Sequence, residues 1–171
     1  MKKVLCTLIT LALTVMLMGC GLRVPRPEVK EGRFNFSVTY EIGGEAKTFS
    51  AVYVCEFDGT DWSLDGGYSR DWDTHVEGDY EGDDYSAILG TTDDGGSIVL
   101  HFGLYPEHFM GDPEIGDWGL PEPSLGITYP ENELGETWHI GDPVELERDY
   151  GIRIVSYEYD EPIENTFGLF K

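Results

Sequence analysis

The chain has 171 residues, of which 40 % are hydrophobic and 13 % aromatic, and its 33 Asp and Glu against 11 Lys and Arg give a formal net charge of −22. This length suits one domain, and the aromatic content can fill a hydrophobic core, so the acidity does not indicate a disordered tail. The charge argues against nucleic acid as a partner, because phosphate binding requires clustered Lys and Arg.

The first 21 residues have the pattern of an export signal. Lys2 and Lys3 precede an apolar run, Val4 to Met18, that contains no charged residue. This run is shorter than the roughly 20 residues that a bilayer span needs. A positive start, a short apolar stretch and a small residue at its end are typical of a secretory signal peptide. The residues that end the run, Leu17-Met18-Gly19-Cys20, resemble the lipobox of bacterial lipoproteins.

The lipobox resemblance implies a processing route and a location. Cleavage would fall between Gly19 and Cys20, which removes residues 1–19, and the Cys20 thiol would carry a diacylglycerol. The mature protein would then be held at the outer face of the cytoplasmic membrane, with the lipid bilayer as its first partner. The alternative is an uncleaved signal anchor, or a plain secreted protein in which Cys20 has no role.

The cysteine count agrees with an exported protein that has no internal disulfide. Cys6 lies in the signal peptide and Cys20 is the lipidated residue, so the rest of the chain keeps only Cys55. Cys55 follows Tyr53 and Val54, which favours a small buried hydrophobe. A reactive thiolate would need a cationic neighbourhood, and this one is apolar and acidic.

Residues 20–33 are predicted to form a lipidated, basic and Pro-containing tether. Four Lys and Arg in this stretch face two Glu, and the X-Pro steps favour extended backbone over helix. The remaining residues 34–171 form the predicted acidic domain, in which 31 Asp and Glu against five Lys and Arg give a net charge of −26. A body of this charge should be repelled from an anionic membrane surface.

Alternating hydrophobicity in the domain predicts strands. From Phe34 to Ile42, apolar and polar residues alternate. A strand would therefore carry aromatic and aliphatic side chains on one face and polar side chains on the other. Gly43-Gly44 follows and suits a two-residue hairpin turn. The return strand would place one residue in two from Phe49 to Phe57 on the same face.

Two further hairpins are predicted. The first joins residues 85–91 to 97–104 across Asp93–Gly96, and the second joins 144–147 to 152–159 across Arg148–Gly151. Shorter strands are expected at 74–77, 125–129 and 137–140, and a long Pro- and Gly-rich loop at 106–130. We therefore predict an all-β fold, a β-sandwich that is immunoglobulin-like or related, with about seven to nine short antiparallel strands.

The acidic stretch Asp71–Asp84 suggests calcium as the one candidate cofactor. Calcium is bound by six to eight oxygen atoms, and the candidate ligands are Asp79, Glu81, Asp83 and Asp84. Their spacing resembles the start of an EF-hand loop, but Asp84 replaces the required Gly and Gly90 replaces the closing Glu. The alternative is a solvated acidic connector.

Aromatic residues beside Asp suggest a surface that stacks on sugar rings. The candidate ligand-binding residues are Trp62, Trp72 and Trp118, and the alternative is burial of these side chains in the core. No catalytic residue is predicted, because no Gly-x-Ser-x-Gly or His-Glu-x-x-His motif is present. The expected function is a non-enzymatic binding or interaction module of the cell envelope, with a protein or a glycan as partner. The alternative is a small envelope hydrolase or a carbohydrate-binding module with an Asp and aromatic site.

Overall fold

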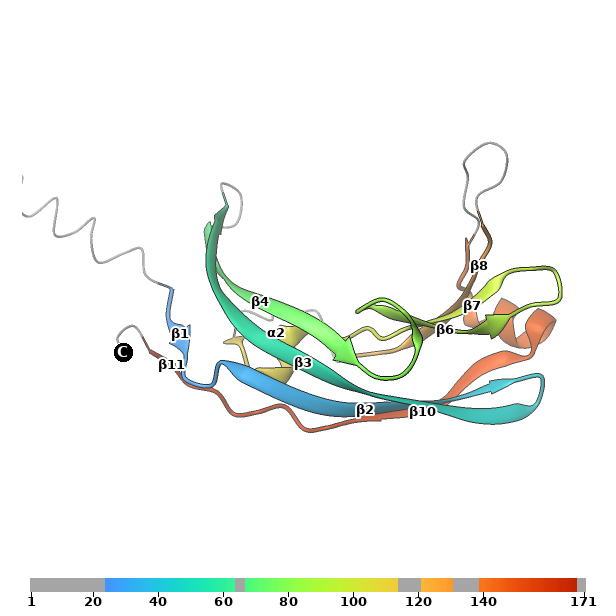
Figure 1. Ribbon diagram of the computed structural model, residues 1–171, viewed down its shortest axis with the longest axis horizontal. Coiled ribbons are helices and arrows are strands. Elements are labelled where there is room, and N and C mark those ends of the chain that lie inside the picture. Colours follow the sequence, from blue (N-terminus) through green and yellow to red (C-terminus); the bar gives the residue numbers. More distant parts are fainter. Residues whose placement is uncertain (1–23, 64–66, 114–120, 131–138, 169–171) are drawn as a thin grey trace, which may run out of the picture.

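Two antiparallel sheets form most of the described structure (Figure 1). The computed structural model describes residues 24–63, 67–113, 121–130 and 139–168. One sheet has the strand order β10-β2-β3-β4, with bounds Ile152–Tyr159, Glu31–Ile42, Glu45–Ser63 and Gly67–Glu77. The other has the order β5-β6-β7-β8-β9, with bounds Glu81–Gly82, Ser86–Thr91, Ser97–His101, Ser124–Thr128 and His139–Ile140.

The remaining elements are short. Strand β1 (Arg26–Pro27) pairs with β11 (Phe167–Gly168), which joins the two ends of the described chain. Helix α2 spans Pro106–Phe109, and α3 (Pro143–Glu145) continues into a π-helical turn, η2 (Leu146–Tyr150). Within the described ranges, no helix is long and apolar enough to cross a membrane. The lipobox residues lie outside these ranges.

The first predicted hairpin is confirmed by strands β2 and β3. Phe36 pairs with Ala51 and Val38 with Phe49. Gly43 and Gly44 have φ angles of 59° and 86°, as a tight hairpin turn with two positive φ values requires. Both strands exceed the predicted short length, with 12 and 19 residues.

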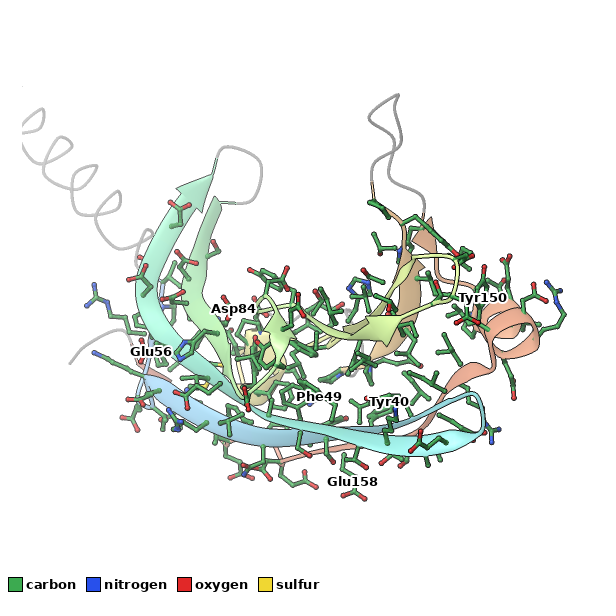
Figure 2. All side chains as sticks on the ribbon, turned by 45° about the vertical axis from the view of Figure 1, so that its right-hand side comes forward. Tyr40, Phe49, Glu56, Asp84, Tyr150 and Glu158 are labelled. Carbon is green, nitrogen blue, oxygen red and sulfur yellow. The ribbon has the colours of Figure 1, made fainter. Side chains whose placement is uncertain are left out.

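The predicted sandwich is also confirmed, because the apolar faces of the two sheets pack on each other. Phe102, which follows β7, lies 5.3 Å from both Phe36 and Phe49 between ring centroids. Figure 2 shows Tyr40 and Phe49 directed between the sheets and Glu158 directed away from them. Strands in the five-stranded sheet follow one another as a meander, which differs from the Greek-key order of immunoglobulin domains. The predicted loop 106–130 contains α2 near its start and β8 near its end.

The second predicted hairpin, β6 to β7, is confirmed, and the third is wrong. Residues 144–147 are helical, and β10 pairs with β2 instead. The cause is local: Asp142 accepts hydrogen bonds from the backbone N–H groups of Val144 and Glu145, with Pro143 at the first helical position. Gly151 then ends η2 in the left-handed region, at a φ of 65°.

The fold begins earlier than the predicted domain boundary at residue 34. Strand β1 and the first three residues of β2 belong to the predicted tether. Pairing of β1 with β11 and of Glu31 with Glu56 holds this stretch against the domain. The part of the tether that precedes the fold is therefore shorter than residues 20–33.

Candidate binding groove

A groove of about 520 Å³ lies between β10, the segment that leads into β8, and the helical turn α3–η2. Its volume is in the range of small-molecule and peptide sites. The lining is mostly apolar and comes from three segments that are far apart in the sequence. The lining residues are Glu122, Pro123, Ser124, Leu125, Pro143, Leu146, Glu147, Ile152, Arg153, Ile154 and Tyr157.

Strand β10 supplies one wall of the groove through an irregular register. Ile154 pairs with Tyr40, and Ser156 pairs with Thr39, so Val155 is an extra residue in a β-bulge. The bulge changes which residues face the core: Ile152 and Ile154 face inward before it, and Tyr157 and Tyr159 face inward after it, opposite Val38 and Phe36. All four side chains therefore line the same side of β10.

The helical turn α3–η2 supplies a second wall of the groove through Pro143, Leu146 and Glu147. The N-cap at Asp142 starts α3, and Leu146, four residues later, is buried. Leu125 and Ile152 are also buried, so they close the groove from below. Nearby apolar side chains remain exposed to solvent, namely Val144 at 71 %, Val155 at 52 % and Tyr157 at 40 %.

The polar groups of the groove stand at its rim and carry net negative charge. Arg153 donates to Glu41 Oε2 from Nη2 at 2.8 Å, and its Nη1 lies 3.5 Å from Glu147 Oε1. These two carboxylates compensate the guanidinium and hold the pKa of Arg153 above its ordinary value. Glu122 and Glu147 are exposed, so the rim presents carboxylates to an incoming ligand.

A second hollow of about 480 Å³ is more open and lies on the outer face of the four-stranded sheet. Its polar atoms bond to each other: Asp160 Oδ2 accepts from both the backbone N–H and the side-chain amide of Asn35, at 2.8 Å each. Glu77, also in its lining, pairs with Arg33. Because Asn35, Asp160 and Glu77 are already paired and the hollow is the more open of the two, it is the weaker candidate for a site.

The candidate calcium ligands are exposed and are not brought together as a metal site. Asp83 Oδ1 accepts from the Tyr85 backbone N–H and from Ser86 Oγ, while Asp84 Oδ1 accepts from the Val76 N–H. The hydrogen bond from Tyr85 is the main reason that the pKa of Asp83 is lowered. Over the described part of the chain, no group of three or more His, Cys, Asp or Glu is arranged to hold a metal ion. Asp83 and Asp84 act as turn residues, and Asp79 and Glu81 lie beside them on the surface.

Of the three candidate Trp residues, only Trp72 has a side chain that the structure describes. Trp72 is only 8 % exposed, packs on Phe57, and donates its Nε1–H to Asp112 at 3.1 Å, so its ring faces are not available to a sugar. Trp62 lies near the end of β3, and its side chain is outside the described part of the structure. Trp118 lies outside the described residues altogether. Cys55 is fully buried, as predicted, and burial raises its pKa to about 12.

A buried ion pair that the sequence did not indicate joins the segments near the two ends of the described chain to the core. Arg70 donates to both carboxylate oxygens of Asp112, at 2.6 and 2.5 Å, and these two side chains are 3 % and 1 % exposed. Arg70 Nη1 also donates to the Pro25 carbonyl at 3.1 Å, and its guanidinium lies 4.6 Å from the centre of the Phe167 ring. We call Arg70, Asp112, Pro25 and Phe167 the terminal clasp. It fixes the first described residues at one end of the sandwich.

Comparison of the chain with models of protein families, with curated proteins and with solved structures finds no match.

Proposed function

We propose that the mature protein is a lipid-anchored extracytoplasmic lipoprotein that acts as a non-enzymatic binding module of the cell envelope. The lipobox resemblance at Leu17–Cys20 supports the anchor, and the groove supports the binding role. The groove has an apolar floor and charged groups on its rim, the combination that ligand-binding sites commonly have.

The observation that carries the proposal is that the helical turn beside the groove and the paired strands β1 and β11 lie at opposite ends of the described structure. Figure 1 shows β1 and β11 together at the left, whereas the helical turn that forms one wall of the groove lies at the right. A lipid on Cys20 would therefore leave the groove directed away from the bilayer, where an envelope partner can reach it.

The terminal clasp also limits the length of the tether. Because Arg70 holds the Pro25 carbonyl, only residues 21–24 separate Cys20 from the fold. Four extended residues span about 13 Å at ~3.3 Å each, so the domain would stay close to the membrane. A short tether restricts the orientations of the domain and keeps the groove on its outer side.

The first prediction tests the anchor with the full-length chain expressed in a bacterial host. Cys20→Ser should abolish lipid attachment and move the protein from the detergent phase to the aqueous phase in detergent partitioning, because the thiol is the lipidated group. Cys6→Ser, in the predicted signal peptide, is the matched control and should partition like the wild type. Identical partitioning of the wild type and Cys20→Ser would exclude the lipoprotein proposal.

A further inference from the structure

We infer that the groove and the free edge of β10 receive an extended, cationic segment of a partner protein, which adds a strand to β10. This inference rests on the proposed function as a binding module and names the chemistry of its partner. It follows from the edge of the sheet, the apolar lining of the groove and the charge of its rim.

The edge of β10 is available for strand addition. Strand β10 is an edge strand of the four-stranded sheet and pairs with β2 on one side. Within the described ranges, no strand pairs with its other side. Alternate residues of β10 therefore direct their N–H and C=O groups away from β2, and a peptide in extended conformation can use these groups.

The lining of the groove suits a segment with apolar residues at alternate positions. Ile154 and Tyr157 of β10 and Leu125 of β8 line it, and an added strand would place one residue in two against them. Tyr157 is 40 % exposed in the free protein, so its ring has apolar area left for a ligand to cover. Main-chain hydrogen bonds would supply affinity and these contacts would supply specificity.

The charge of the rim selects a cationic segment. The positive charge of Arg153 is balanced by the carboxylates of Glu41 and Glu147, so the rim keeps an excess of negative charge. Glu122 and Glu147 are both exposed and can attract a positive group of the ligand. The net charge of −26 on residues 34–171 extends this preference over a longer range, because it accelerates the approach of cations and repels anions.

A second copy of the chain is the less suitable occupant of this edge. Two bodies with this negative charge repel each other. The bulge at Val155 also interrupts the regular hydrogen-bonding pattern that two equal edges need for long pairing, a device that natural sheets use against self-association. A short cationic segment of a different protein avoids the charge repulsion, and it needs only a few regular pairs on either side of the bulge.

The probe is an amidated seven-residue peptide that alternates lysine and valine, titrated into the purified mature protein by isothermal titration calorimetry. Saturable binding with a stoichiometry of one is expected, and the same peptide with glutamate in place of lysine should not bind. Tyr157→Ala should weaken binding about tenfold, the usual effect of removing an aromatic contact. Val144→Ala, which truncates a more exposed apolar residue outside the groove lining, should leave it unchanged.

A pair of charge reversals separates the groove from the general acidity of the surface. Glu122→Lys and Glu56→Lys change the net charge equally, but Glu122 lines the groove, whereas Glu56 is exposed at the other end of the molecule from Tyr150 (Figure 2). Glu122→Lys should weaken peptide binding and Glu56→Lys should have little effect. Circular dichroism and the melting temperature of each variant check that the fold is kept.

Three results would overturn the inference. They are the absence of saturable binding, equal binding of the lysine and glutamate peptides, and equal weakening by Glu122→Lys and Glu56→Lys. A concentration-dependent dimer in sedimentation that Tyr157→Ala abolishes would instead assign the edge to a second copy. These measurements do not depend on the lipid, so the Cys20→Ser protein should give the same binding results as the wild type. Failure of the anchor proposal in detergent partitioning is therefore distinguishable from failure of peptide binding at the groove.

Discussion

The side chain of Arg70 connects segments that are far apart in the chain. It contacts Asp112 after α2, the Pro25 carbonyl before β1 and the ring of Phe167 in β11. Its partner Asp112 also accepts from Trp72. A bidentate Arg–carboxylate pair in a buried site fixes geometry as well as charge, so this contact orients the chain ends on the sandwich.

Removing one member of this pair should be strongly destabilising. Asp112→Ala leaves the Arg70 charge buried without its carboxylate and should lower the free energy of unfolding by about 3–5 kcal/mol. Urea denaturation of the mature protein measures the loss. The combined change Arg70→Met with Asp112→Leu should cost less than Asp112→Ala alone, because no charge remains buried.

The exposed pair of Arg148 and Asp149 provides the control for this prediction. Its side chains are 66 % and 42 % exposed, and such pairs contribute about 0.2–1 kcal/mol. Asp149→Ala should therefore change the urea midpoint only slightly. If Asp112→Ala and Asp149→Ala have similar effects, the terminal clasp does not contribute to stability.

His108 in α2 should make stability depend on pH. Its Nε2 is buried and has no hydrogen-bond partner among the described residues, and burial lowers its pKa below the ordinary value of 6.5. In the interval between its folded pKa and 6.5, the unfolded chain binds a proton that the folded protein does not. This contribution to stability is therefore present above pH 6.5 and is lost as the pH falls toward the folded pKa.

Comparison with His108→Leu isolates the contribution of this imidazole from that of the many carboxylates. The free energy of unfolding of the wild type, relative to that of the variant, should fall between pH 6.5 and pH 5 by on the order of 1 kcal/mol or less. Urea unfolding at a series of pH values gives both curves. A constant difference between them across this interval would contradict the prediction.

At the scale of elements, the sequence predicted strands well where period-two alternation and a turn signal occur together. This combination is present in 34–57 and in 85–104, and both hairpins form. The sequence predicted residues 144–147 wrongly, because the helix start at Asp142-Pro143 outweighs the alternation of the four residues Val144–Glu147. The partner of β10 could not be predicted, since β2 lies more than 100 residues earlier and alternation identifies a strand without naming its neighbour.

The groove was missed for a related reason, since its walls come from three distant segments. One local signal was present in β10, where the apolar residues Ile152, Ile154, Tyr157 and Tyr159 alternate with a single offset. Such an offset is the sequence pattern of a β-bulge. The candidate Trp and Asp residues were chosen by residue type alone, and type does not determine whether a side chain is buried, as in Trp72, or occupied in a turn, as in Asp83.

The bulge gives a prediction at the same scale. Deletion of Val155 would shift the second half of β10 by one residue, and a one-residue shift turns every side chain to the opposite face. Tyr157 and Tyr159 would leave the core side, and the free energy of unfolding should fall by about 2–4 kcal/mol. Val155→Ala keeps the extra residue and should have little effect, because this side chain is half exposed. Urea unfolding of both variants distinguishes the register from the side chain.

For the whole molecule, charge opposes stability. The net charge of −26 on residues 34–171 repels itself in the compact state, so cations that screen it should stabilise the fold. Sodium chloride shortens the Debye length from ~10 Å at 0.1 M to ~3 Å at 1 M without requiring a site. The melting temperature should rise over this range, and a gain of 1 kcal/mol corresponds to about 2–4 °C for a chain of this size.

The same measurement tests the calcium hypothesis for Asp79, Glu81, Asp83 and Asp84. A calcium site prefers calcium to magnesium, because it offers a flexible set of many oxygen ligands, and it acts at millimolar concentration. Asp83 and Asp84 already accept hydrogen bonds from the backbone of their own region, which favours equal, screening-type shifts with both cations at fixed ionic strength. A calcium-selective shift that disappears in the double variant Asp79→Asn with Asp83→Asn would contradict this expectation. That result would mean that the loop rearranges around the ion, because the exposed carboxylates of the free protein do not form a site.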